Sequence, residues 1–320
     1  MKKGLTSATA TALLLLTAMI WGFAFAAQRA AGVAFGSISI ICLRSIIAFF
    51  VLIPVVMLFD RLRGDDRHLF WRQNGRLQIG ITRVEWVGGF FCGLALGVAS
   101  LLQQYGLLYN QSSGKTAFIT ALYVALVPVF GAFVGRRTSL LVWLGVLGSV
   151  GGAFLLAFDF AGGEQISLAL GDLLVLLCAV VFAVQILVID RFSPRCDGIR
   201  ISLVQFLTGA VITLPFMLIV EGATLTPAAF SAGILPLLYL GVMSSGVAYT
   251  LQIIGQKKTH PAVASVVMSL ESVFGLLGGA IVFGEQLEKP SEIAGCVVLF
   301  ASVLLTQLGE LVKKKEEKKL

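Results

Sequence analysis

Long apolar stretches dominate the chain, and short polar segments separate them at nearly regular intervals. Each stretch is about 20 residues long, the length that an α-helix needs to cross ~30 Å of hydrocarbon. Backbone groups in lipid must pair internally, and no period-two alternation of a membrane barrel is present, so helices are predicted. The pattern predicts ten transmembrane helices, at about residues 8–28, 35–59, 85–108, 113–135, 139–158, 170–189, 201–220, 231–254, 262–283 and 292–311.

Composition changes this picture little and excludes a soluble protein. Hydrophobic residues are 58% of the 320 residues, charged residues are 13%, and the mean hydropathy is +0.94. A soluble protein carries roughly 25% charged residues. The expected fold class is therefore all-α integral membrane. The only long polar segment is 60–83, in which an interfacial helix is predicted around Leu69–Trp71.

The first apolar stretch also has features of a signal peptide. Lys2 and Lys3 precede it, and Ala24–Ala26 has the small-x-small spacing of a cleavage site. Nine further stretches follow it, however, and it has a counterpart in the second half of the chain. We therefore expect it to be retained as the first helix.

Basic residues indicate how the helices are oriented. With a cytoplasmic N-terminus, 20 Lys and Arg residues fall on the cytoplasmic side and three on the outer side: Arg29, Lys115 and Lys289. This asymmetry is the positive-inside pattern. It predicts a multi-pass protein of the cytoplasmic membrane with both termini in the cytoplasm and residues 309–320 as a basic cytoplasmic tail. The net charge of +7 belongs to that face, so it does not indicate a nucleic-acid partner.

Two segments of the chain repeat each other. Residues 97–106 read GVASLLQQYG and residues 246–255 read GVAYTLQIIG, with six identities at a constant offset of 149. A weaker match at an offset of 161 pairs Arg44 with Gln205. Five helices per half is an odd number, so the second half must enter the membrane from the other side. The sequence thus predicts two inverted five-helix repeats, which commonly enclose a transport pathway.

Short motifs in both halves resemble the EamA domain of the drug/metabolite transporter superfamily: Ile20–Phe25, Arg44, Val127–Phe130, Gly171–Leu174, Phe182–Ala183, Leu270–Phe274 and Gly284–Glu285. The resemblance covers two five-helix repeats, residues 9–158 and 170–308. It implies a central cavity lined mainly by helices 1, 3, 4, 6, 8 and 9, with helices 5 and 10 at the periphery. Ser272 stands where the family has a proline, which puts a kink in the ninth helix in doubt.

Polar and aromatic residues inside the predicted helices are candidates for solute binding, because a polar group at that depth normally faces a cavity or a partner. Two of them, Gln103 and Gln252, lie near opposite membrane faces, as mirrored gates of a carrier would; interfacial glutamines without a special role are the alternative. The predicted substrate-binding or gating residues are Trp21, Gln103, Tyr123, Gln185, Ser245, Tyr249, Gln252 and Glu271.

Three of these residues, and Arg44 in the second helix, have competing interpretations. Glu271 could contact a solute amine, carry a coupled proton, or form structural hydrogen bonds to neighbouring helices. For Arg44 a packing or ion-pair role is preferred to a carboxylate clamp, since the EamA resemblance places helix 2 away from the main cavity. Trp21 fits cavity lining and core packing equally well. Tyr249 is also suited to anchoring at the membrane interface.

Glycine spacing predicts close helix packing. Gly89, Gly93 and Gly97 recur every fourth residue on one face of the third helix. Small residues at this spacing allow two backbones to approach, which membrane helices need because lipid gives them no hydrophobic reason to associate. Such small residues would also form a smooth surface along which one helix bundle could tilt against another.

Signals for an enzyme are weak. Gly114–Thr116 resembles the end of a P-loop, but Tyr109 occupies the position of its first glycine and no strand precedes it. The two histidines, His68 and His260, are predicted in separate loops and suggest no metal cluster. The sequence therefore predicts no enzyme activity, no metal site and no cofactor.

Together these features predict a secondary transporter that moves a small organic metabolite by alternating access. An amino acid or related solute suits a cavity rich in amide and aromatic groups, and export is what the resemblance implies. The expected partners are the solute and the lipid bilayer; a proton, a counter-solute and a homo-oligomer stay open. The alternative is a membrane-embedded enzyme or scaffold, which would need a catalytic cluster or a large extramembrane surface.

Overall fold

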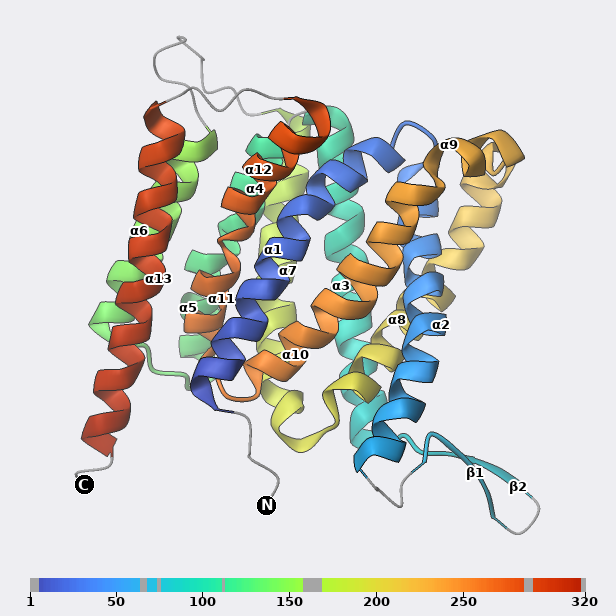
Figure 1. Cartoon of the computed structure of the whole chain (residues 1–320), viewed down its shortest axis with the longest axis horizontal. Coiled ribbons are helices and arrows are strands. Elements are labelled where there is room, and N and C mark those ends of the chain that lie inside the picture. The colour runs from blue at the N-terminus through green and yellow to red at the C-terminus, as the bar shows by residue number, and fades with distance from the viewer. Residues whose placement is uncertain are drawn as a thin grey trace.

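The computed structural model describes residues 6–63, 68–73, 76–110, 113–157, 169–284 and 290–317, and they form a helical bundle (Figure 1). The first half contains α1 (Ser7–Ala31), α2 (Ser37–Arg63), α3 (Arg83–Asn110), α4 (Ser113–Ala121), α5 (Tyr123–Phe133) and α6 (Leu140–Ala157). The second half contains α7 (Leu170–Phe192), α8 (Gly198–Phe216), α9 (Pro227–Leu238), α10 (Thr250–Gln256), α11 (Pro261–Met268), α12 (Glu271–Phe283) and α13 (Pro290–Glu317). Short 3₁₀ turns, η1 (Ser193–Arg195) and η3 (Gly222–Thr224), and two π-helical segments, η2 (Met217–Glu221) and η4 (Tyr239–Tyr249), complete the second half.

The predicted all-α membrane class is confirmed. Within the described residues, nine continuous spans are long and apolar enough to cross a membrane, and α6 is a further, shorter apolar helix. Five of the nine combine several elements: α4 with α5, α7 with η1, α8 with η2 and η3, α9 with η4 and α10, and α11 with α12. The ten helices match the ten predicted stretches.

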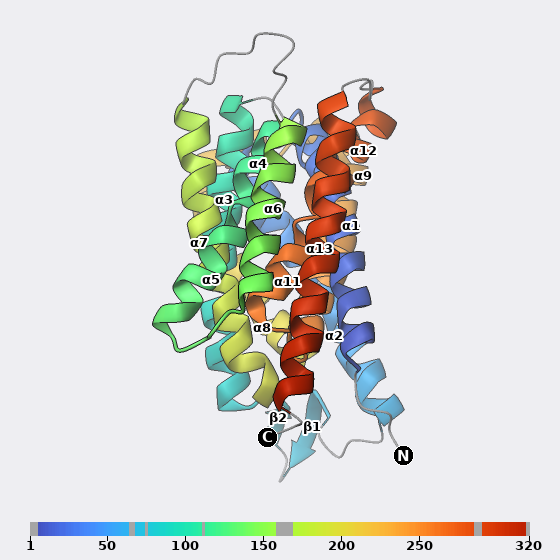
Figure 2. The same cartoon turned by 90° about the vertical axis from the view of Figure 1, so that its left-hand side faces the viewer.

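The two halves run through the bundle in opposite directions. Both termini lie on one side, from which α1 rises, whereas α7 begins at the other side (Figures 1 and 2). We call these the terminal side and the opposite side. An odd number of spans per half produces this inversion, and the five-helix units are therefore inverted repeats.

One span in each half is broken. Leu122 separates α4 from α5, and Ser269 and Leu270 separate α11 from α12. At the second break the Ser272 amide donates to the Ser269 carbonyl at 3.1 Å, a three-residue turn in place of the α-helical bond. The ninth span is thus interrupted without the family's proline. Such backbone is tolerated at membrane depth where it lines a cavity.

The segment between α2 and α3 differs from its prediction. It forms an antiparallel hairpin of β1 (Phe70–Gln73) and β2 (Arg76–Ile79), so the interfacial helix predicted around Leu69–Trp71 is wrong. The hairpin is fixed by buried charge: Asp60 accepts from the Leu69 amide at 2.9 Å and from Arg200 Nη2 at 2.6 Å. Arg200 Nε also donates to the Gly80 carbonyl at 2.8 Å. The local pattern of apolar residues does not reveal the contact between Asp60 and Arg200, which are 140 residues apart in the sequence.

Glycines set the closest helix contacts. Gly22 of α1 faces the backbone of Phe274 and Gly275 in α12, where an added Cβ would lie within 2.3–2.7 Å of existing atoms. Gly152 of α6 and Gly295 of α13 approach each other's backbones in the same way. The α6–α13 pair lies at one end of the bundle, where the EamA resemblance places helices 5 and 10 (Figure 2).

Candidate functional site

A cavity lies among the inner helices of both repeats, and we call it the central cavity. Its volume is small: a water-sized sphere can be centred in only about 30 Å³ of it. The site is therefore closed to a metabolite in this conformation. Its lining residues are Trp21, Ala24, Phe25, Gln28, Arg44, Gln103, Thr120, Tyr123, Phe182, Gln185, Ile186, Ser244, Tyr249, Gln252 and Glu271.

The structure brings together the candidates that the sequence singled out, with one exception. Every predicted substrate-binding or gating residue lines the central cavity except Ser245. Ser245 lies immediately behind the wall and accepts a hydrogen bond from Arg44 Nε at 2.8 Å. Its neighbour Ser244 lines the cavity instead.

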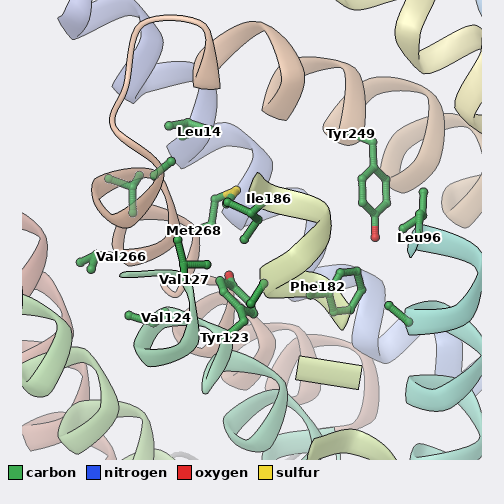
Figure 3. Close-up of a cluster of buried hydrophobic side chains, with 14 of the residues drawn as sticks. Leu14, Leu96, Tyr123, Val124, Val127, Phe182, Ile186, Tyr249, Val266 and Met268 are labelled. Carbon is green, nitrogen blue, oxygen red and sulfur yellow. The ribbon is translucent and has the colours of Figure 1, made fainter. Parts of the chain in front are cut away.

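Aromatic residues form one wall of the central cavity. The rings of Trp21 and Tyr249 have centroids 4.5 Å apart and are tilted by 52°. Trp21 Nε1 donates to the Ser244 carbonyl at 3.3 Å, so α1 and η4 are fixed to each other at this depth. Figure 3 shows Tyr123, Phe182 and Tyr249, from three separate elements, directed into the same region. Such a wall suits the apolar part of a solute and can stack against it.

The two broken spans place their second halves at this site. Tyr123 is the first residue of α5 and Glu271 is the first residue of α12, and both line the central cavity. The Tyr123 hydroxyl lies within interaction distance of the Glu271 carboxylate, so the two broken spans meet at this pair of polar groups.

Arg44 is the cation of the central cavity. Its side chain is only 5% exposed, and it donates from Nε to Ser245 Oγ and from Nη2 to Ser244 Oγ, at 2.8 and 2.9 Å. The ion pair predicted as one role for Arg44 is not found among the described residues, because hydroxyls rather than carboxylates hold it. Helix 2 therefore contributes to the cavity, contrary to the expectation from the family resemblance.

Two glutamine contacts lie at the ends of the central cavity. Gln103 Nε2 donates to Thr120 Oγ1 at 3.2 Å, which joins α3 to α4. Gln185 and Gln252 exchange amide hydrogen bonds of 3.4 and 3.3 Å, which join α7 to α10. Each contact links helices of a single repeat. Gln103 and Gln252 correspond to each other in the repeat, but their partners do not: Thr120 belongs to the fourth span and Gln185 to the sixth.

A larger vestibule approaches the central cavity from each side of the bundle. The vestibule on the opposite side, around Arg29, Gly36 and Gln104, admits a water-sized sphere over about 350 Å³, and Gln28 lines both it and the central cavity. The vestibule on the terminal side, which includes Gln256, gives about 430 Å³. Gln256, which lines this vestibule, lies one helical turn beyond Gln252 of the central cavity in α10.

The glycine stripe of α3 has two different environments. A Cβ on Gly89 would lie 2.4 Å from Val204 Cβ, and one on Gly93 would lie 2.4 Å from the Gln205 carbonyl, so both face α8. Gly97 differs from the prediction, because a Cβ there would meet nothing within 4 Å. It lines a small space beside Arg44 rather than a helix contact.

Sequence reasoning missed part of the cavity wall. Gln28, Thr120, Phe25 and Ile186 line the central cavity but were not among the predicted site residues. Gln28 carried a usable signal, since it is a glutamine at the end of an apolar stretch. Phe25 and Ile186 carried no such signal, because the sequence does not distinguish an apolar residue that faces a cavity from one that faces lipid.

The central cavity offers charged, amide and aromatic groups that can bind a solute. Among the described residues, no group of three or more His, Cys, Asp or Glu side chains could hold a metal ion. Two inverted repeats around a polar cavity, embedded in ten apolar helices, define an integral membrane transporter. The model of the EamA-like transporter family matches residues 8–158 and 169–307, so the chain belongs to that family.

Individual relatives agree with this assignment. An uncharacterized transporter of Archaeoglobus fulgidus is 29% identical over 231 residues, 70% of either chain. The uncharacterized inner membrane transporter YedA of Escherichia coli K12 is 26% identical over 197 residues, 62% of this chain and 63% of its own. A crystal structure with 20% identity superposes with a TM-score of 0.74 over 95% of this chain and 98% of its own, which shows a shared fold.

Proposed function

We propose that the chain is a secondary transporter that exports a small organic metabolite, an amino acid or related solute, across the cytoplasmic membrane by alternating access. The observation that carries the proposal is a nearly closed central cavity between two open vestibules. In an alternating-access carrier each vestibule connects with the central site in turn while the opposite neck stays shut.

The lining of the central cavity supports a zwitterionic or neutral solute. It contains one cation, Arg44, and one carboxylate, Glu271, among amide and aromatic groups. A phosphate-bearing solute would call for several cationic groups, as Arg and Lys clusters provide elsewhere. In this proposal Glu271 contacts a solute amine or carries a coupled proton, and Gln103 and Gln252 act in the two necks.

The proposed orientation places the terminal side in the cytoplasm. The basic residues of loops and tails support it, as they would lie at the cytoplasmic face under the positive-inside rule. The terminal-side vestibule would then receive the solute, and its cationic rim includes Arg136, Arg137, Lys257 and Lys258. Export follows the EamA resemblance.

Flux through reconstituted liposomes tests the proposal. Purified protein in liposomes preloaded with labelled amino acids should release at least one of them with saturable kinetics, and protein-free liposomes should not. A membrane-embedded enzyme or scaffold would give no saturable flux for any small metabolite. That result would end the transporter proposal.

A further inference from the structure

Arg44 is a buried cation that lacks a counter-charge. It is the eighth residue of the 27-residue helix α2, 5% exposed, and no carboxylate pairs with it among the described residues. Placing a charged side chain inside the membrane costs about 2.5 kcal/mol or more of free energy. Such a residue therefore normally pairs with an opposite charge or has a functional role. Two neutral hydroxyls, from Ser244 and Ser245, do not compensate the charge.

Arg200, the other deeply buried arginine among the described residues, shows what a structural role looks like. Arg200 is 1% exposed and binds Asp60 at 2.6 Å, Asp197 at 3.7 Å and the Gly80 carbonyl at 2.8 Å. Its charge and its fork of donors are both satisfied. Arg44 has neither carboxylate nor carbonyl in its hydrogen bonds, and it lines the central cavity.

The groups that hold Arg44 orient it without neutralising it. Ser244 and Ser245 lie on the π-helical segment η4, a type of helix that is rare and frequent at functional sites. They engage Nε and Nη2 of the guanidinium. No hydrogen bond with a described residue occupies Nη1. A fixed guanidinium presents planar donors that match a carboxylate.

We propose that Arg44 binds the carboxylate of the transported solute. This inference rests on the proposed transport function and specifies the solute class as amino acids with a free carboxylate. Arg44, Tyr249 and Glu271 all line the central cavity, and Tyr249 is near enough to interact electrostatically with both charged residues. The amine end of the solute then faces Glu271, and its side chain lies against the Trp21 and Tyr249 rings.

Thermal-shift measurements on the purified full-length protein test the carboxylate site. The probes are the proteinogenic L-amino acids, each beside its amide and its decarboxylated amine. A ligand that binds only the folded state raises the Tm. For the wild type we expect Tm shifts with one or more acids and none with the matching amides and amines.

Variants of Arg44 extend the test. Arg44→Gln should weaken binding of the active acid at least about 30-fold, the loss that follows from removing one partner of a buried charge pair. Arg44→Lys keeps the charge but loses the forked pair of donors, so its affinity for the acid should lie between those of the wild type and Arg44→Gln. Arg61→Gln is the matched control, because Arg61 is an exposed arginine of the same helix.

Three outcomes would overturn the inference: amides or amines that shift the Tm as much as the acids do, an unchanged affinity in Arg44→Gln, or no shift with any acid. The comparison of acids with their amides and amines on the wild-type protein tests the inference even if both Arg44 variants fail to fold. Liposome flux separates this inference from the transport proposal. Flux of a carboxyl-free solute alone would refute the Arg44 site and leave the transporter standing.

Discussion

At the scale of single residues, the protein keeps its few deep charges apart. Arg44 and Glu271 both line the central cavity, but they do not pair with each other among the described residues. If Arg44 and Glu271 formed an ion pair, each would neutralise the other, and neither charge would be available to bind a solute. Separate charges cost folding free energy, and binding of a zwitterion would offset that cost in the transport cycle.

Glu271 gives the first prediction at this scale. Glu271→Gln keeps the shape of the side chain but removes the carboxylate, so we expect at least about tenfold slower flux at saturating solute or a correspondingly higher KM. If Glu271 carries the coupled proton, the dependence of initial flux on pH should also vanish. The measurement is initial efflux from liposomes across a pH series.

Glu292→Gln is the matched control for that experiment. Glu292 lies in the first turn of the peripheral helix α13, away from the central cavity, so its variant should transport as the wild type does. A Glu271→Gln protein with wild-type rate and wild-type pH dependence would leave Glu271 as a purely structural residue.

At the scale of elements, the broken and π-helical spans shape the site. The breaks at Leu122 and at Ser269–Leu270 set Tyr123 and Glu271 at the start of new helices, and η4 presents Ser244 and Ser245 to Arg44. Regular helices would direct these side chains elsewhere. The site therefore depends on departures from helix geometry at residues that hydrophobicity does not distinguish.

Helix α3 gives a prediction at this scale through its glycines. Gly93→Ala should destabilise the protein by about 1–3 kcal/mol, because the new Cβ would meet the Gln205 carbonyl at 2.4 Å and Thr208 Cβ at 2.7 Å. Gly97→Ala, four residues along, meets nothing within 4 Å and should be neutral or slightly stabilising, since alanine favours helix. The measurement is the Tm of each purified variant; equal Tm values would contradict the packing role of Gly93.

At the scale of the whole molecule, inversion produces two similar approaches to one site. The vestibules lie on opposite sides. Gln28 lines both the central cavity and one vestibule, and Gln256, one helical turn from Gln252, lines the other. The structure is closed at the centre. Movement of one repeat against the other could open either neck while the residues that bind the solute stay in place.

Orientation in the cell membrane is the prediction at this scale. In a cysteine-free background, Val33→Cys and Lys258→Cys place single exposed thiols on the opposite side and the terminal side. A membrane-impermeant maleimide added to intact cells should label Val33→Cys, and should label Lys258→Cys only after permeabilisation. The reverse pattern would refute the cytoplasmic placement of the termini, and identical labelling of both would refute the inverted arrangement.

The sequence by itself determined the class, the ten spans and the inverted repeat, because a bilayer imposes a length and an apolarity on each helix that appear directly in residue order. It also marked seven of the fifteen residues that line the central cavity, since a polar residue inside an apolar stretch normally faces a cavity or a partner. Only the tertiary structure decided that Arg44 faces the cavity with serines as partners, that Gly97 borders open space, and that residues 70–79 form a hairpin fixed by Arg200 and Asp60. Those features depend on contacts between distant segments, and such contacts leave no local pattern.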